Sequence, residues 1–318
     1  MQQSRSATET DLSGLDWTEW CARTGELAGE DGFAEMLGPD HTAIFIENKP
    51  ILLVTFENFD EIRQISPSAQ PLGWQMMDAL GWSHLCLVSN GETWFRERRV
   101  YGFFDRLIDD GFLEDFDQVI FYGAGPCGYA AAAFSVAAPG ARVLALQPQA
   151  TLDPRIAEWD DRFRHMRRTD FTSRFGYAPD MIDAAEHAYI VYDPEEELDA
   201  MHAALFTRAN VTKLRARFFG LDLQKALLDI EVLFRMLAQI SAGKFDIRNR
   251  ARLLRARRSS PAYQFTLLRH LQARERHGLI IHLCRFVLER RNARPFRKAA
   301  ATAQKAIDEQ AAETATEE

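Results

Sequence analysis

The stretch from Gln118 to Ala132, which reads QVIFYGAGPCGYAAA, constrains the fold of this chain more than any other segment. Val119–Tyr122 is a continuous apolar run, as expected of a strand that is buried on both faces. Three glycines follow within six residues, and an alanine-rich segment of high helix propensity comes next. A second apolar run, Arg142–Leu146, lies beyond it. The pattern predicts a strand, a tight turn, a helix and a second strand, which together form a βαβ unit.

Strand and helix patterns alternate along residues 30–243, and this alternation predicts a mainly parallel sheet flanked by helices. The last expected strand is Val211–Phe218. Residues 153–183 have little strand pattern but are rich in charged and aromatic side chains, so we expect a lid-like helical insertion there. The predicted fold class is therefore α/β, with an all-α extension at the C-terminal end.

The charge of the chain changes abruptly after residue 243. Residues 1–243 carry 21 basic and 38 acidic side chains, whereas residues 244–298 carry 16 basic and 3 acidic ones. A change this sharp predicts a domain boundary. We therefore expect four parts: an N-terminal segment with a short helix (1–29), the α/β domain (30–243), a basic helical extension (244–298) and a disordered acidic tail (299–318).

The glycine turn and its surroundings resemble the serine-elbow proteins of the α/β-hydrolase-like family. In those proteins the turn reads roughly Y-G-S-S-M-G-G-Y, and here residues 122–129 read YGAGPCGY. The strand that follows ends in Ser-Pro-Gln in that family and in Gln147-Pro148-Gln149 here. The later stretch 187–202, HAYIVYDPEEELDAMH, resembles the family's strand-then-aspartate segment. The resemblance implies an α/β-hydrolase-like fold in which Gly125 stands at the nucleophile position and Asp193 at the position of the triad acid.

Three parts of the serine machinery are missing from the residues that carry this resemblance. Gly125 has no side chain that could attack a carbonyl carbon. The residue after the nucleophile normally donates its N–H to the oxyanion, but Pro126 has no N–H. The triad histidine should follow the last strand, yet the next histidine is His270. The sequence therefore predicts a non-catalytic or degenerate member of the fold, a pseudoenzyme that acts as a binding or scaffold module.

Cys127 offers an alternative nucleophile. It lies near the predicted start of a helix, where the helix dipole lowers the pKa of a thiol, and Gly128 after it carries an N–H. Together with Asp193 and His202, its thiolate would form the site of a thiol-dependent hydrolase or acyltransferase. The competing interpretation is a small buried cysteine that packs under the turn. The residues favour this second interpretation, because His202 falls within a predicted helix.

The same turn also matches a dinucleotide-binding pattern. Gly123, Gly125 and Gly128 satisfy G-x-G-x-x-G between a strand and a helix, and GAGPCG resembles the flavin-binding turn G-A-G-P-A-G. That resemblance implies FAD or NAD, with the pyrophosphate at the helix N-terminus. The acidic residue that should hold the ribose is missing, since the next strand ends in Leu146-Gln147. A third interpretation needs no cofactor, because the glycines also let a strand and a helix pack closely.

Cysteine usage and apolar content argue against several other classes of protein. The first 14 residues are polar and give no sign of a signal peptide. No apolar run reaches the roughly 18 residues that span a bilayer, so we expect no membrane segment. The scattered cysteines form no CxxC pair, so we expect neither a metal site nor disulfides and infer a reducing, cytoplasmic compartment. These cysteines are Cys21, Cys86, Cys127 and Cys284.

The basic extension, residues 244–298, is expected to contact an acidic surface. A basic surface with interleaved aromatic residues would also suit nucleic acid. Charge asymmetry within one chain is not a specific sign of nucleic-acid binding, however, and the α/β domain is itself strongly acidic. We therefore expect the arginines to dock on the chain's own acidic domain, in a homo-oligomer or on another protein.

Similar chains from alphaproteobacteria are often labelled phosphoadenosine phosphosulfate reductases, which would imply a role in sulfate assimilation. The pattern typical of that family has an S-G-G-K-D-S turn and a cysteine in a C-terminal E-C-G-L-H string. Neither string occurs in this sequence, and Cys284 falls in an amphipathic helical pattern instead. The residues therefore do not support the label.

Overall fold

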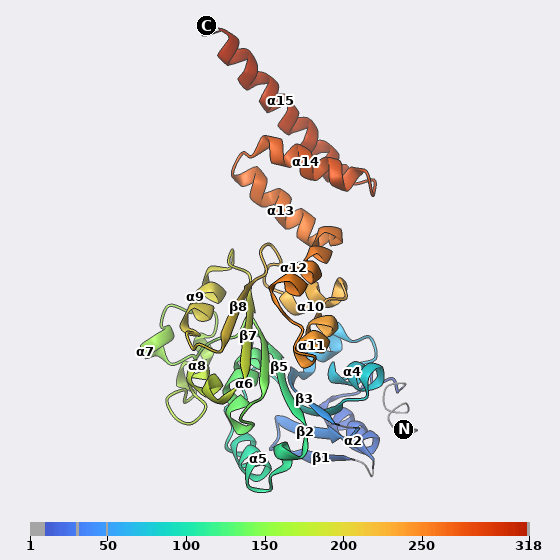
Figure 1. Ribbon diagram of the computed structural model, residues 1–318, viewed down its shortest axis with the longest axis vertical. Helices are drawn as coiled ribbons and strands as arrows, with labels where there is room; N and C mark the ends of the chain where they lie inside the picture. Colours follow the sequence, from blue (N-terminus) through green and yellow to red (C-terminus); the bar gives the residue numbers. More distant parts are fainter. Residues whose placement is uncertain (1–9, 30–31, 49, 317–318) are drawn as a thin grey trace.

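An eight-stranded sheet forms the centre of the molecule (Figure 1). The computed structural model describes residues 10–29, 32–48 and 50–316. Across the sheet the strands follow the order β1-β2-β4-β3-β5-β6-β7-β8. The strands are β1 (Gly32–Met36), β2 (His41–Ile46), β3 (Ile51–Asn58), β4 (Ser83–Ser89), β5 (Gln118–Ala124), β6 (Arg142–Leu146), β7 (His187–Tyr192) and β8 (Val211–Arg215).

The direction of the strands confirms the predicted fold class. β2 pairs antiparallel with both of its neighbours, β1 and β4. Every other pair of neighbouring strands is parallel, with β3 between β4 and β5. A mostly parallel sheet with this strand order, flanked by helices, is an α/β-hydrolase-like fold. The predicted βαβ unit is present as β5, the helix α6 (Pro126–Phe134) and β6.

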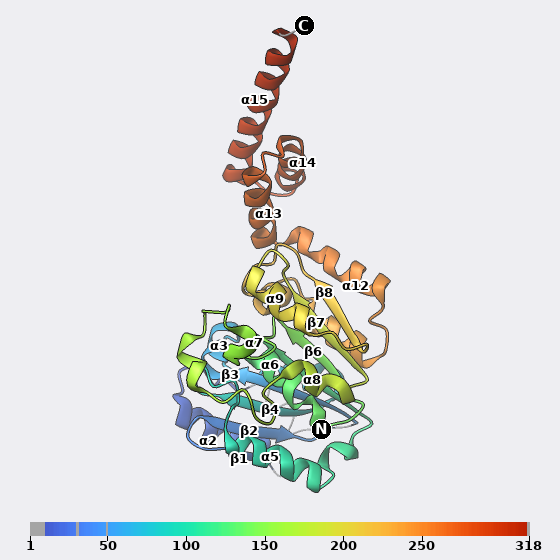
Figure 2. The ribbon, with the colours of Figure 1, turned by 90° about the vertical axis from the view of Figure 1, so that its left-hand side faces the viewer.

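Helices cover both faces of the sheet (Figure 2), because side chains along the buried strands alternate between the two faces. On β3, Val54 and Phe56 pack into one apolar cluster, while Leu53 belongs to another. The first cluster lies under α5 (Arg98–Asp109), α6, α8 (Ala178–Met181) and α9 (Glu197–Leu205). The opposite face carries α2 (Trp17–Ala28), α3 (Phe59–Ile65), α4 (Gly73–Leu80), α10 (Leu223–Asp229) and α11 (Leu233–Ser241).

The N-terminal segment packs against the sheet through its predicted helix, which is α2. A capping box starts this helix: Asp16 accepts the N–H of Glu19, and the Glu19 side chain accepts the N–H of Asp16. Trp20 is fully buried and packs edge-on against Phe59. The first nine residues of the predicted segment lie outside the described residues.

The predicted insertion, residues 153–183, consists of short helical turns joined by loops. Its helical pieces are α7 (Pro154–Ala157), the 3-10 helix η3 (Arg164–Arg168), α8 and the start of η4 (Ile182–Ala184). Four of its aromatic side chains pack on the body; among them, Phe171 and Phe175 are buried in the same core cluster as α6. The insertion is therefore anchored to the sheet by apolar contacts rather than by strand pairing.

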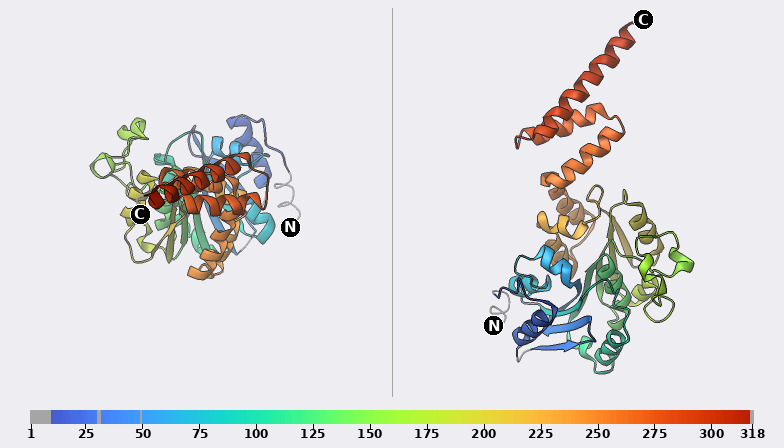
Figure 3. Two further views of the ribbon diagram at one scale, coloured as in Figure 1. Left: turned by 90° about the horizontal axis from the view of Figure 1, so that it is seen from above. Right: turned by 180° about the vertical axis from the view of Figure 1, so that it is seen from behind.

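The basic extension divides into two parts. α12 (Ile247–Leu253) and the 3-10 helix η5 (Leu254–Ser259) lie near the body, where Phe245 is buried against Tyr189. The helices α13 (Pro261–Ala273), α14 (His277–Leu288) and α15 (Arg294–Thr316) pack on one another and project away from the sheet (Figures 1 and 3). They share a small apolar core of their own, which includes Leu268, Cys284 and Phe296.

The expectation of a disordered tail at 299–318 is wrong for the part that the structure describes, because α15 continues through Thr316. The segment is rich in alanine, which has the highest helix propensity. Pairs four residues apart support it further, with Lys305 and Glu309 at 3.4 Å. Residues 317–318 lie outside the described residues. Although α15 has 23 residues, neither it nor any other described helix is apolar enough to cross a membrane.

We predict that Phe296→Ala loosens α13–α15 without loosening the sheet. Phe296 is fully buried in the core of these three helices, and its ring lies 4.9 Å from that of Phe265, centre to centre. The cavity left behind should cost about 3 kcal/mol locally. Hydrogen–deuterium exchange should become faster in α13–α15 and stay unchanged in β5 and α6. Phe265→Ala, at a side chain that is 38% exposed, should have a smaller effect. Equal acceleration in β5 would show that the two parts unfold together.

Candidate functional site

The turn between β5 and α6 is a sharp, strained corner. Gly125 caps α6 with φ 54° and ψ −124°, a conformation that residues with a side chain rarely adopt. Its N–H donates to the carbonyl oxygen of Leu146 at 2.8 Å, which ties the turn to the end of β6. A Cβ atom at Gly125 would meet nothing within 4 Å. A side chain at this position would therefore extend into open space.

The other two glycines of the turn are explained by close packing. A Cβ atom at Gly123 would lie 2.1 Å from the carbonyl oxygen of Cys127, which is an impossible contact. A Cβ atom at Gly128 would lie 2.9 Å from the carbonyl oxygen of Leu146. Both glycines let α6 approach the ends of β5 and β6. Dinucleotide binding at this turn stays a prediction, since packing alone accounts for these two residues.

Two adjoining cavities open beside the turn, at the carboxyl ends of the central strands. Ligands bind at this edge in open α/β sheets. The smaller cavity has a volume of about 380 Å³ and is lined by residues of β3, α3, α10 and the turn, including Cys127. The larger has about 510 Å³ and extends to the insertion through Arg162 and Phe163. Residues common to both walls are Glu61, Ile65, Ala124, Gln224 and Lys225.

Four acidic side chains line the smaller cavity, and two of them, Glu57 and Glu61, have a raised pKa. Glu57, at the end of β3, is 8% exposed and accepts the N–H of Leu72 at 2.9 Å. Burial raises the pKa of Glu57 above its ordinary value. Glu61, in the first turn of α3, also faces the larger cavity. Burial, followed by the charges of Asp222, Glu57 and Glu92, raises the pKa of Glu61 to about 7. Perturbed carboxyl groups of this kind gather at functional sites.

Glu57 also belongs to a buried chain of hydrogen bonds. The Thr55 hydroxyl donates to Glu57 Oε1 at 2.7 Å, and its oxygen lies 2.8 Å from His84 Nε2, which therefore carries a proton. Burial lowers the pKa of His84 to about 3, so the ring is neutral. Glu57, His84 and Cys86 form the one group of described residues with metal-ligand spacing, all within 4.8 Å. Thr55 already bridges two of the three, so the cluster is held together without an ion.

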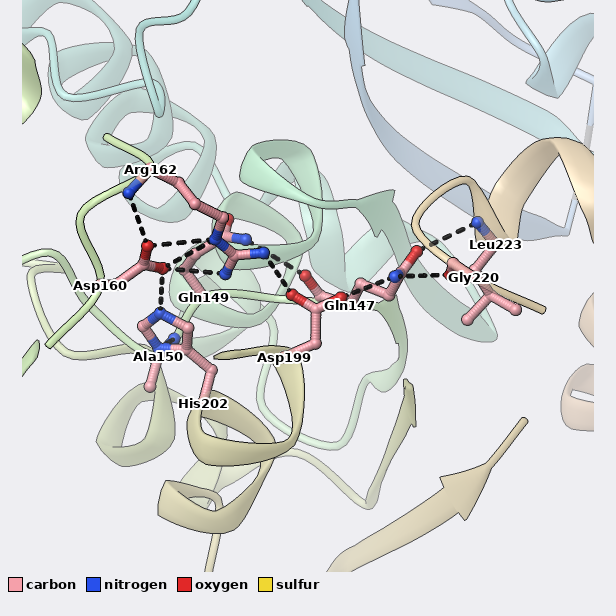
Figure 4. A network of polar contacts seen from close by, with 9 residues as sticks. All are labelled: Gln147, Gln149, Ala150, Asp160, Arg162, Asp199, His202, Gly220 and Leu223. Carbon is pink, nitrogen blue, oxygen red and sulfur yellow. Dashed lines mark hydrogen bonds and ion pairs between the residues drawn. The ribbon is translucent and has the colours of Figure 1, made fainter. Parts of the chain in front are cut away.

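A network of charged and amide side chains connects the insertion to the body (Figure 4). Arg162 donates to Asp160 at 2.8 Å and to Asp199 at 2.7 Å, and both acids are buried. Gln147 Nε2 donates to the other oxygen of Asp199 at 2.7 Å. The Gln147 side-chain oxygen accepts the N–H of Leu223 at 3.1 Å. The network thus joins the insertion, α9, the end of β6 and the start of α10.

His202 and Asp193, two of the predicted thiol-site residues, bind separate partners. His202 on α9 is fully buried; its Nδ1 accepts the N–H of Ala150 at 3.1 Å, so Nε2 carries the proton and donates to Asp160 at 2.9 Å. Asp193 follows β7 and accepts the N–H of Gly220 at 2.8 Å. Burial lowers the pKa of His202, so it stays neutral in this position. Both ring nitrogens are therefore already engaged away from the turn.

The third predicted residue, Cys127, lies in the first turn of α6 and lines the smaller cavity. It is 3% exposed. Burial, followed by the charges of Glu61 and Glu57, raises the pKa of the Cys127 thiol well above its ordinary value. Burial thus acts on the thiol pKa in the direction opposite to the helix dipole that the sequence argument invoked. Among the described residues no hydrogen bond joins Cys127 to Asp193 or His202, and the thiol site stays a prediction.

Sequence reasoning used Gln147 and Gln149 only as part of the family resemblance and assigned them no role in a cavity, although both line the larger one. Gln147 has φ 46°, a strained value for a residue with a side chain. Gln149 is 3% exposed, and its side-chain oxygen has no partner among the described residues. The signal that could have found both is the Gln-Pro-Gln sequence directly after a buried strand. Glu61 gives no such signal, because its role depends on where α3 lies.

Comparison with known proteins gives distant similarities. No model of a protein family matches the sequence, and no curated protein sequence matches it. Among solved structures, a chain of the Glycosylation Associate Protein (Gap123) complex from Streptococcus agalactiae is 14% identical, with a TM-score of 0.45. The match covers 68% of this chain and 47% of that chain, so this chain spans about half of that protein's length.

Two further solved structures are similar at the same low level. Est1E from Butyrivibrio proteoclasticus is 12% identical, with a TM-score of 0.40, over 67% of this chain and 100% of that one. Brefeldin A esterase, described as a bacterial homologue of human hormone sensitive lipase, is 12% identical with a TM-score of 0.39. That match covers 76% of this chain and 83% of the esterase. Because these scores are low, the fold assignment rests on the strand order itself.

We predict that Glu61→Gln stabilises the protein at high pH but not at low pH. The pKa of Glu61 is raised on folding, so the native state loses stability as pH rises from about 4.5 through about 7. Glutamine removes this loss and should increase the free energy of unfolding by about 2 kcal/mol at pH 8. Urea unfolding at pH 8 and pH 5 would measure the difference, with exposed Glu158→Gln as the control. Equal effects of both variants at pH 8 would contradict the assignment.

Proposed function

We propose that this protein is a non-catalytic α/β-hydrolase-like binding module that takes a small molecule into the cavities beside Gly125. The observation that carries the proposal is the conformation of Gly125 at the strand-to-helix turn. In hydrolases of this fold the nucleophile occupies such a strained turn between a strand and a helix. Here that position adjoins the cavities with no side chain to attack a substrate.

Two further features support the loss of serine chemistry. Pro126 follows Gly125 and starts α6, so the backbone N–H that would bind an oxyanion does not exist. His202 is buried with both ring nitrogens bonded, to Ala150 and to Asp160. A histidine that serves as a general base needs a free nitrogen near the attacking atom. Nucleophile, oxyanion donor and base therefore all argue against an acyl-transfer reaction at this turn.

The charge of the cavity walls indicates which kind of molecule would bind. The cations Arg162 and Lys225 are already paired, the first with Asp160 and Asp199 and the second with Asp229 at 2.8 Å. Glu61 has no hydrogen bond to its carboxyl group among the described residues, and it lies between both cavities. Such walls favour a small molecule with hydrogen-bond donors, above all an amine cation.

Three alternatives from the sequence stay open to the same experiments. A hydrolase or acyltransferase would use the Cys127 thiol. FAD or NAD would bind at Gly123–Gly128, but the side chain of Gln147, where a ribose-binding acid is expected, is bonded to Asp199 and to α10. The assignment as a sulfate-assimilation reductase rests only on the label given to similar chains. The buried thiol and the engaged glutamine are the reasons why we favour a binding role.

The first test is a search for covalent and catalytic activity. We expect no labelling of the wild-type protein by a fluorophosphonate probe and no turnover of a panel of p-nitrophenyl esters. Gly125→Ser should remain equally inactive, because Pro126 still lacks an N–H and no free histidine is near. Turnover that disappears in Cys127→Ser would establish the thiol enzyme instead. Turnover that survives in Cys127→Ser would place the reactive centre elsewhere.

The second test asks whether the cavities bind a donor-rich molecule. In a thermal-shift screen of small amines and polyols, we expect at least one amine to raise the melting temperature of the wild-type protein. Binding should be stronger at pH 8 than at pH 6, because the pKa of Glu61 is about 7. Glu61→Gln should abolish the pH dependence and weaken binding about tenfold, whereas exposed Glu158→Gln should not. An amine that binds both variants equally would refute this site.

A further inference from the structure

A row of arginines runs along the outer side of α12 and η5. Arg248, Arg252 and Arg255 are all exposed and lie at positions i, i+4 and i+7, so they share one helix face. We call these three residues the arginine face. No carboxylate lies within 4.0 Å of any of them in the described part of the chain. Of the three contacts expected for the basic extension, an ion pair with the chain's own acidic domain is not made by this face among the described residues, which leaves a second copy or another protein.

The arginine face begins beside an exposed apolar side chain. Ile247, the first residue of α12, is 73% exposed, the largest exposed fraction among the large apolar side chains of the described residues. It directly precedes Arg248. An isolated exposed isoleucine is unremarkable on its own. Next to the arginine face, however, Ile247 forms a surface that is partly cationic and partly apolar. Such a surface complements one with an acidic rim and an apolar centre.

A surface of that kind is present on the same chain, at the end of α5. A groove of about 310 Å³ is lined by apolar side chains such as Leu107, Ile108 and Leu113, together with Glu114 and Asp117. We call it the acidic groove. Exposed acids surround it, and in the described part of the chain none of them is in an ion pair: Asp109, Asp110, Glu114, Asp115 and Asp117.

The two surfaces cannot meet within one molecule. α5 lies at the end of the body that is farthest from the projecting helices, whereas α12 lies next to those helices (Figures 1 and 2). Each surface therefore needs a partner outside its own chain, and each chain carries the complement of the other's surface.

We propose that the arginine face of one copy of this chain docks into the acidic groove of a second copy, with Ile247 entering the groove. The contact joins two different surfaces, so it is heterologous and repeats from copy to copy, giving a ring or a linear chain. Charge complementarity steers and aligns the two surfaces, while the apolar side chain supplies buried area. A nucleic acid is the weaker fit, because the whole chain carries a net charge of −8.

The test is a charge exchange, read by sedimentation velocity with the full-length protein. We expect the wild type to exceed the monomer mass as its concentration rises and to dissociate in high salt. The triple variant Arg248→Glu, Arg252→Glu, Arg255→Glu should associate at least tenfold more weakly, as should Asp110→Lys, Glu114→Lys, Asp117→Lys. An equimolar mixture of the two variants should associate again, since each now carries the complement of the other. This recovery also shows that both variants are folded.

Two controls separate docking from general charge effects. The triple variant Arg285→Glu, Arg294→Glu, Lys298→Glu changes the net charge equally at exposed positions on α14 and α15, and it should associate like the wild type. Ile247→Ser keeps every charge and should weaken association about tenfold. A wild type that stays monomeric at all concentrations would overturn the proposal. A mixture that fails to associate would do so too, as would RNA binding by the arginine face without self-association.

Discussion

The close approach of α6 to β5 and β6 is the constraint on which the rest of the structure depends. Gly123 and Gly128 lie where a single added carbon would collide with backbone oxygens. Gly125 then turns the chain through a positive φ and bonds to the end of β6. These contacts fix the centre of the sheet and place the turn beside both cavities. Gly123 and Gly128 thus pack the helix on the strands, while the position of Gly125 faces open space.

Local pattern was sufficient to predict the centre of the fold. The apolar runs at 119–122 and 142–146, with glycines and alanines between them, contain all the information that a βαβ unit requires. The candidate site is different, because burial raises the pKa of both Glu57 and Glu61, and the charges of Asp222 and Glu57 raise that of Glu61 further. Arg162 likewise pairs with Asp199, 37 positions away. Such pairings depend on how loops cross the sheet, which periodicity does not encode. At α15, composition suggested disorder, but alanine propensity prevails.

Unpaired charge lies inside the cavities and at two places on the surface. Inside the cavities Arg162 is paired with acids of the network in Figure 4 and Lys225 is paired with Asp229, which leaves Glu57 and Glu61 without a cationic partner among the described residues. On the surface, the arginine face and the exposed acids at the acidic groove are unpaired among the described residues. The acidic cavities and the arginine face can therefore bind different molecules without competing.

The three projecting helices keep their apolar side chains among themselves, around Cys284 and Phe296. Their connection to the body passes through Ser259–Ser260, with ring contacts between Phe218 and His270 nearby. A protease that cut the chain at Ser259–Ser260 would release a body that keeps its whole sheet, both cavities and the arginine face. Selection can therefore lengthen, shorten or replace α13–α15 without changing the sheet, the cavities or the arginine face.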